Sequence, residues 1–201
     1  MVDLYAGIGY FTLTYLVHSK AQHLHACEWN LDAVDALKKN LRLNKVEDRC
    51  TIYQGDNKET CPRLVADRVN LGLIPSSEDG WPVACAALKH TGGFLHIHSN
   101  VETKMKNMDK SENVDLENKL EANMAIGGSN EKHDSVLKTS QLNKKRQWTG
   151  WADDVSQKIH ELMCSTHPNT NWKIITSHIE HVKSYAPHVD HVVLDLECRP
   201  I

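Results

Sequence analysis

The sequence predicts an α/β fold whose mainly parallel sheet is completed by an antiparallel hairpin at the C-terminal end. Three observations predict it. Short apolar runs alternate with helical stretches from residue 2 to about residue 97. A turn with two glycines follows the first apolar run, and two β-branched runs separated by a proline turn close the chain. Strands that alternate with helices are joined by right-handed crossovers, so most of the sheet should be parallel.

The elements follow one another regularly along the first half of the chain. The expected strands are VDLYA (2–6), HLHACEW (23–29), CTIYQGD (50–56), RVNLGLIP (68–75) and GGFLHIHSN (92–100). The expected helices cover residues 10–21, about 31–43 and 82–90. The side chains of the first helix that should face the sheet are Phe11, Leu13, Leu16 and Val17.

A polar stretch over residues 103–146 interrupts this pattern. It is rich in Lys, Glu, Asn, Asp and Ser, and no aromatic residue occurs between Phe94 and Trp148. Such a segment buries too little apolar surface to offset its ordering entropy, so we expect a disordered or weakly helical insertion. It is either a solvated loop or a docking element for a partner. Residues 147–201 then add an amphipathic helix and the terminal hairpin to the same domain.

Composition and charge restrict the class of protein. The six cysteines are scattered without a C-x-x-C pair, which favours reduced thiols in a cytoplasmic protein over a zinc site or a disulfide framework. No apolar run approaches the length of a membrane span, and no signal peptide is recognisable. The net charge of −3 lacks the basic footprint of a domain that grips nucleic acid by itself. If the substrate is a nucleic acid, most phosphate contacts must come from elsewhere.

The glycine turn is the first candidate for a binding site. Gly7 and Gly9 follow the first strand directly, but Thr12 stands where the third glycine of a dinucleotide-binding turn would be. The two-glycine version is a weak signal alone, because it could simply make a tight turn between strand and helix.

Polar residues at the ends of the next two strands strengthen that signal. Glu28 ends the second strand, where an acid can accept hydrogen bonds from two ribose hydroxyls, and Asp56 and Asn57 follow the third, where they can receive an adenine amino group. Each has a simpler alternative: Glu28 as an exposed strand-end acid, Asp56 as a helix cap. Together they predict an adenosine-containing ligand without a pyrophosphate. S-adenosylmethionine is the natural candidate, bound by residues 1–102.

The loop after the fourth strand should border the reacting centre. Enzymes that modify exocyclic amino groups of bases often carry Asn-Pro-Pro-aromatic there, whereas this chain has Leu73, Ile74, Pro75 and Ser76. The missing amide argues against an amino-group methylase. No catalytic residue is assigned, and Ile74, Pro75 and Ser76 are the loop candidates.

The histidines are interpreted as packing residues. His96 and His98 alternate on one strand and share a face, while His188 and His191 flank the hairpin turn. No nearby cysteine or acid completes a metal set with His96 and His98, and no metal is expected.

Several segments together resemble one known family. They are VDLYAGIGYFTL, HACEWN, GDN, LGLIPSSEDGWP, LHIHSNVE and VKSYAPHVDHVVLDLEC. They are similar to the tRNA wybutosine-synthesizing protein 2 family, the tRNA 4-demethylwyosine aminocarboxypropyltransferases, which are related to the tRNA guanine-N1 methyltransferases. The resemblance covers residues 2–101 and 148–198.

The resemblance implies a Rossmann-like, class I adenosylmethionine-dependent transferase fold. The implied reaction moves the 3-amino-3-carboxypropyl group of S-adenosylmethionine to 4-demethylwyosine in phenylalanine tRNA, releasing methylthioadenosine. Carried over to this chain, Glu28 would hold the ribose, and Asp56 and Asn57 the adenine side. The further residues implied at the cofactor pocket are Asp3, Tyr5, Gly7, Gly9 and Trp29.

The chain departs from the family pattern in three ways. Thr14 and Leu31 stand where family members usually have proline. Family members also have a long N-terminal part with a tRNA-binding region and further cofactor contacts. The resemblance therefore implies a truncated, monomeric form of reduced activity, whose grip on tRNA lies mainly in that absent region. A non-catalytic fragment and a guanine-N1 methyltransferase are the alternatives.

Overall fold

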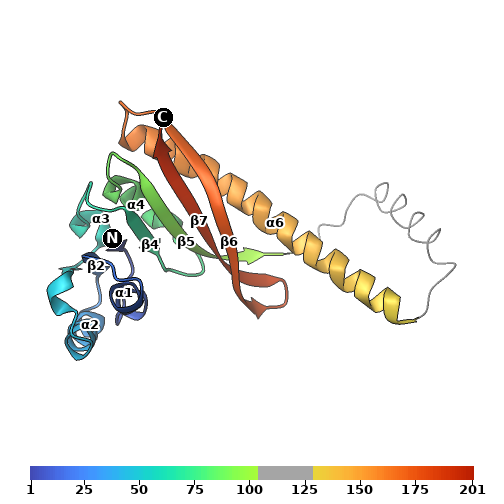
Figure 1. Cartoon of the computed structure of the whole chain (residues 1–201), viewed down its shortest axis with the longest axis horizontal. Coiled ribbons are helices and arrows are strands. Elements are labelled where there is room, and N and C mark those ends of the chain that lie inside the picture. Colours follow the sequence, from blue (N-terminus) through green and yellow to red (C-terminus); the bar gives the residue numbers. More distant parts are fainter. Residues whose placement is uncertain (104–128) are drawn as a thin grey trace.

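One sheet organises the computed structural model, which describes residues 1–103 and 129–201 and the side chains of 1–103 and 141–201 (Figure 1). Its strand order is β3-β2-β1-β4-β5-β7-β6. The strands are β1 (Val2–Asp3), β2 (Leu24–Glu28), β3 (Cys50–Gln54), β4 (Arg68–Leu71), β5 (Gly93–Glu102), β6 (Trp172–Ala186) and β7 (Val189–Pro200).

The strand order creates a switch point beside β1. From β1 the chain builds β2 and β3 on one side, then returns to add β4 and β5 on the other, and all five strands are parallel. β7 runs antiparallel to both β5 and β6, which forms the expected terminal hairpin. Ligands of open α/β sheets bind at the carboxyl ends of the strands at such a point. The predicted Rossmann-like architecture with its antiparallel hairpin is confirmed.

Helices cover both faces of the sheet. They are α1 (Tyr10–Leu13), which continues into a π-helical turn (Thr14–His18), α2 (Leu31–Leu43), α3 (Asn57–Thr60), α4 (Trp81–Ala87) and α6 (Ser129–Thr166). Short 3-10 turns cover Glu47–Arg49 and Glu78–Gly80. In Figure 1, α4 and α6 lie behind the sheet, while α2 lies near β2, toward the end of the sheet that β3 and β2 form. No helix among the described residues is long and apolar enough to cross a membrane.

Two apolar clusters hold these layers together. Alternation along β2 explains them, because Leu24 and Ala26 pack toward α2 while Cys27 points to the opposite face. On that face α6 buries Val155 and Ile159, as its four-residue spacing requires. Burying the apolar side chains of both faces fixes the carboxyl ends of the strands relative to one another.

Several predicted boundaries were wrong. The helix α6 begins at Ser129, so the boundary expected at residue 147 falls inside a helix. The remainder of the expected insertion, residues 104–128, lies outside the described residues. The first strand ends at Asp3, and the fourth ends at Leu71 rather than at residue 75. The expected first helix is α1 and its π-helical turn, which leaves Val17 39% exposed while Leu16 is buried.

Candidate functional site

A cavity of about 750 Å³ opens at the carboxyl ends of the strands beside the switch point. It lies where a ligand of a doubly wound sheet is expected. Its lining residues are Leu4, Tyr5, Gly7, Cys27, Glu28, Trp29, Gly55, Asp56, Asn57, Lys58, Gly72, Leu73 and Asp79. Most of the residues that the sequence predicted line the cavity where β1 and β2 end and α3 begins.

The glycine turn forms one wall of the cavity. Gly7 has φ of +54°, and its N–H donates a hydrogen bond of 2.8 Å to Glu28 Oε2. Gly9 has φ of +102°, and a Cβ built on it would lie 2.7 Å from Leu37 Cδ1. Only Gly7 lines the cavity, whereas Gly9 allows the turn to pack closely against α2.

Glu28 is the buried acid of the site. Its Oε2 accepts the Gly7 N–H and its Oε1 accepts the Asn30 N–H, each at 2.8 Å, and the residue is 9% exposed. An ionised carboxylate offers about four lone-pair sites, so each oxygen retains a position for a further donor. Two backbone bonds therefore fix the orientation of the carboxylate while leaving it able to accept from a pair of hydroxyls.

Asp3 is a buried residue next to the cavity wall. It is fully buried, accepts hydrogen bonds from Thr12 Oγ1 (2.7 Å) and Asn70 Nδ2 (3.0 Å), and does not line the cavity. Burial raises the pKa of the Asp3 carboxyl, and its hydrogen bonds oppose that shift. The carboxylate ties α1 and β4 to the end of β1, so the structure makes Asp3 a support rather than a ligand-facing residue.

The start of α3 supplies the opposite wall. Asp56 Oδ1 caps α3 by accepting the Lys58 N–H at 2.9 Å, so the helix cap considered as its alternative role is present in a residue that also lines the cavity. Asn57 Nδ2 donates to the carbonyl oxygen of Leu4 at 3.0 Å, which ties α3 to the chain that leaves β1.

Two aromatic residues complete this end of the cavity. Tyr5 is half-buried, and burial raises the pKa of its phenol. Trp29 is 74% exposed at the rim and follows Glu28 directly. A large exposed indole at a cavity mouth can cover a planar ligand.

The loop after β4 differs from the prediction. Gly72, Leu73 and Asp79 line the cavity. The loop candidates Ile74, Pro75 and Ser76 are not among the lining residues. The Ile74–Pro75 peptide bond is cis.

Backbone contacts tie this loop to β5. The carbonyl oxygen of Pro75 accepts the Asn100 N–H at 2.8 Å and the Ser99 hydroxyl at 3.3 Å. Ser76 Oγ accepts the Glu78 N–H at 3.2 Å. The residues proposed from the sequence therefore hold the loop in place, and its first residues reach the cavity.

Six cavity residues were not predicted. Leu4, Cys27, Gly55, Lys58, Gly72 and Asp79 line the cavity without having been assigned a role. Cys27 and Lys58 stand next to predicted residues in the sequence, so adjacency was an available signal. Asp79 is brought to the cavity by the 3-10 turn before α4, which no local pattern indicated.

The histidines pack against other side chains. His98 Nδ1 lies 3.2 Å from His191 Nε2, and burial lowers the pKa of His98 to about 4. His96 Nδ1 lies 2.7 Å from Oδ1 of Asp195, which is 99 residues away in the sequence and was not predicted to be its neighbour. In the parts of the chain that the structure describes, no three His, Cys, Asp or Glu side chains are grouped to hold a metal ion.

Comparison with known proteins agrees with this geometry. Residues 1–126 match the family model described as the TRM5/TYW2 methyltransferase domain. The chain is 50% identical over 203 residues to the tRNA wybutosine-synthesizing protein 2 homolog of Danio rerio and 48% identical over 209 residues to that of Homo sapiens. Both alignments cover 100% of this chain and 46% of the relative, so the chain spans about half the length of the curated relatives it matches.

A solved structure shares the fold over the whole chain. M. jannaschii TYW2, crystallised in complex with AdoMet, superposes with a TM-score of 0.63 at 26% sequence identity, covering 100% of this chain and 68% of that one. The switch-point cavity, the sequence match and the shared fold lead to the same assignment: the chain belongs to the TRM5/TYW2 methyltransferase-domain family.

Proposed function

We propose that the chain is the S-adenosylmethionine-binding part of a tRNA 4-demethylwyosine aminocarboxypropyltransferase of wybutosine biosynthesis. It would transfer the 3-amino-3-carboxypropyl group of S-adenosylmethionine to the base in phenylalanine tRNA and release methylthioadenosine. The observation that carries this proposal is the convergence of Gly7, Glu28 and Asp56 on one cavity at the switch point. The wybutosine-synthesizing relatives and the AdoMet-bound TYW2 support the choice of ligand.

The cavity fits an adenosine-containing donor. Its volume of about 750 Å³ lies within the roughly 300–1,000 Å³ of ligand pockets. The anchored carboxylate of Glu28 suits a ribose diol, and Asp56 with Asn57 suits the adenine edge. Trp29 can cover the adenosine at the rim.

The chemistry asks little of the protein beyond position. S-adenosylmethionine supplies an activated sulfonium leaving group, so holding the acceptor in line and excluding water can account for much of the acceleration. Leu73 places an apolar side chain at the cavity where the loop begins, and the loop has no asparagine amide to hold an exocyclic amino group. This argues against an exocyclic amino group as the acceptor.

Methyl transfer is the second candidate, because the matching family model is described as a methyltransferase domain. The same cavity could direct the methyl carbon rather than the aminocarboxypropyl carbon at the acceptor. The by-product distinguishes the two reactions. Methylthioadenosine after incubation with phenylalanine tRNA supports the proposal, and adenosylhomocysteine contradicts it.

The biological setting forms part of the same proposal. The partner is phenylalanine tRNA, held mainly by a region outside this chain, and the chain acts as a monomer in the cytoplasm. The six free cysteines support a reducing compartment.

Substitution of Glu28 tests the donor site. Glu28→Gln replaces an acceptor oxygen by an NH2 group, which cannot accept from the ribose and faces a backbone N–H. Hydrogen bonds to charged groups contribute about 1.5–3 kcal/mol, so the Kd for S-adenosylmethionine should rise about 10- to 100-fold by isothermal titration.

The matched control is Glu59→Gln, which changes an exposed acid of α3 that does not line the cavity. The control should bind like the parent. Equal affinities of Glu28→Gln and the parent would mean that the donor does not bind through Glu28.

A further inference from the structure

Five aromatic rings form a continuous row across the carboxyl edge of the sheet. The ring centroids of Tyr10 and Phe11 are 5.1 Å apart, and those of Phe11 and His98 are 4.9 Å apart. His98 and His191 follow at 5.3 Å, and His191 and Tyr185 at 6.4 Å. We refer to these five residues as the ring row. It joins α1, β5, β7 and β6, which are far apart in the sequence.

The ring row begins beside the loop that reaches the donor cavity. A Cβ built on Gly72, which lines the cavity, would lie 3.1 Å from two atoms of the Phe11 ring. The row meets β5 at His98, one residue beyond Ile97, which pairs with Leu71 at the end of β4. From there it crosses to His191 of β7 and Tyr185 of β6. The row therefore runs outward from the acceptor side of the site.

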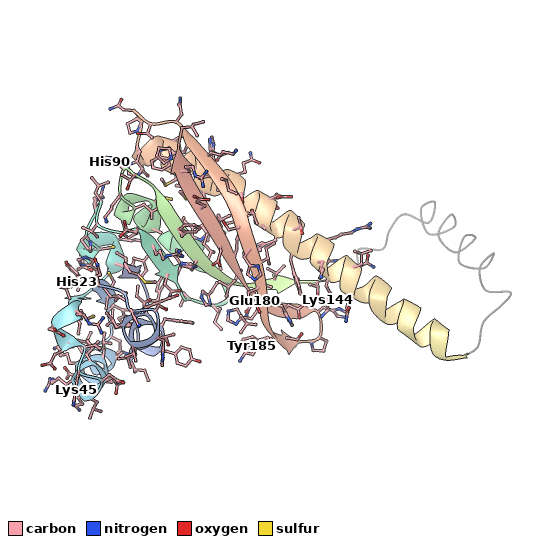
Figure 2. All side chains as sticks on the ribbon, viewed as in Figure 1. His23, Lys45, His90, Lys144, Glu180 and Tyr185 are labelled. Carbon is pink, nitrogen blue, oxygen red and sulfur yellow. The ribbon has the colours of Figure 1, made fainter. Side chains whose placement is uncertain are left out.

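Its two ends are exposed while its middle is buried. Tyr10 is 77% exposed and Tyr185 is 51% exposed, whereas His98 and His191 are 5% and 9% exposed. Figure 2 shows Tyr185 near the free end of the β6–β7 hairpin. The buried histidines fix the positions of the rings, and the two tyrosines form the exposed ends of the row.

The charges beside the row suit a polyanion with exposed bases. Lys183 Nζ lies 4.6 Å from the centroid of the Tyr185 ring. Residues 181–188 contain no acid, and the neighbouring Asp190 is buried and paired with Lys144 and His181. Burial lowers the pKa of both His98 and His191, so the middle of the row stays uncharged near neutral pH. A cation beside an aromatic platform is the combination by which proteins hold unpaired nucleotides.

We propose that the ring row binds unpaired bases of the substrate RNA that flank the reacting base. This inference rests on the proposed function, because it places the reacting base at the loop beside Phe11. The bases stack on Tyr10 and Tyr185, and Lys183 contacts a phosphate. An RNA loop fits better than a helical duplex, since the row offers ring faces and few cations.

Binding of a fluorescein-labelled RNA stem–loop to the chain, followed by anisotropy, tests the inference. The parent should bind the stem–loop more tightly than a duplex of the same stem. Tyr185→Ala and Tyr10→Ala should each raise the Kd about tenfold, as loss of one base–ring stack does. Tyr185→Phe, which keeps the ring, should bind like the parent. Lys183→Ala should reduce the slope of log Kd against log salt by about 1.

Two matched variants control for nonspecific effects. Leu43→Ala removes an apolar side chain that is 79% exposed, and Lys173→Ala removes an exposed lysine at the other end of β6. Neither should change the Kd for the stem–loop. Equal binding of stem–loop and duplex, no RNA binding by the parent, or equal losses in Tyr185→Phe and Tyr185→Ala would overturn the inference.

Titration of the same variants with S-adenosylmethionine separates this inference from the proposed function. The tyrosine variants should bind the donor like the parent, since neither residue lines the cavity. RNA binding that depends on Tyr185 without any donor binding would contradict the proposed function and support the ring row. Donor binding without RNA binding would support the proposed function and contradict the inference about the ring row.

Discussion

At the scale of single residues, two carboxylates near the glycine turn have different roles because their surroundings differ. Glu28 reaches the cavity and keeps acceptor positions, whereas Asp3 is enclosed by Thr12 and Asn70. The resemblance implied a place for both at the cofactor pocket. The enclosure of Asp3 by Thr12 and by Asn70, which is 67 residues away in the sequence, separates a supporting residue from a ligand-facing one, so the sequence could not distinguish them.

His98 should make the stability of the fold depend on pH. Its folded pKa of about 4 lies below its ordinary value of 6.5, so protonation favours the unfolded chain. The contribution of the neutral His98 ring to the free energy of unfolding is therefore fully present above about pH 6.5 and is lost as the pH falls toward about pH 4. Its size is about 3 kcal/mol if the whole shift applies.

Urea unfolding across that pH window checks this prediction. His98→Phe removes the titrating group, so its free energy of unfolding should fall less steeply with decreasing pH than that of the parent. The difference in slope is the relevant quantity, because the variant also leaves His191 without its hydrogen-bond partner. If the free energies of unfolding of the parent and of His98→Phe fell equally steeply with decreasing pH, the prediction would be contradicted.

At the scale of elements, local signals predicted some segments well. The helix α2 has the expected bounds because Asn30 caps it, accepting the N–H groups of Asp32 and Ala33, and its apolar residues recur at helical spacing. The start of α6 was missed because its polar residues carry no apolar periodicity. The π-helical turn Thr14–His18 was also missed, since it rotates Val17 away from the face that a regular helix would bury.

The glycine turn gives a prediction at this scale. Gly9→Ala should reduce the free energy of unfolding by about 2–4 kcal/mol, because an alanine at positive φ is strained and its Cβ would meet Leu37. Gly7→Ala is the matched change, with positive φ but no atom within 4 Å of the added Cβ, and should cost only about 1 kcal/mol. Thermal or urea unfolding compares the two. Equal losses of unfolding free energy in the two variants would mean that the contact with Leu37 of α2 is not the reason that residue 9 must be glycine.

At the scale of the whole molecule, the strand order brings the predicted residues together. Gly7, Glu28 and Asp56 lie at or just after the carboxyl ends of three different strands, and the parallel sheet with its switch point beside β1 places all three around one cavity. The alternation of strands and helices sufficed to predict that arrangement. The loop residues 74–76 could not be placed, because their pairing with β5 depends on nonlocal backbone contacts.

A second cavity, at the other end of the strands, provides an internal control for ligand binding. This cavity of about 640 Å³ lies near the amino ends of the strands and is lined in part by His25, Arg68 and Lys89. It contains none of the residues expected to hold the donor. A ligand specific to the switch-point cavity should therefore leave it undisturbed.

An amide NMR titration of the chain with S-adenosylmethionine tests the central claim most directly. Shifts should concentrate at Gly7, whose N–H donates to Glu28, and at Gly55 and Gly72. The amides of His25 and Lys89 in the second cavity should stay unchanged. Shifts confined to the second cavity, or no shifts at saturating donor, would contradict the assignment of the switch-point cavity as the donor site.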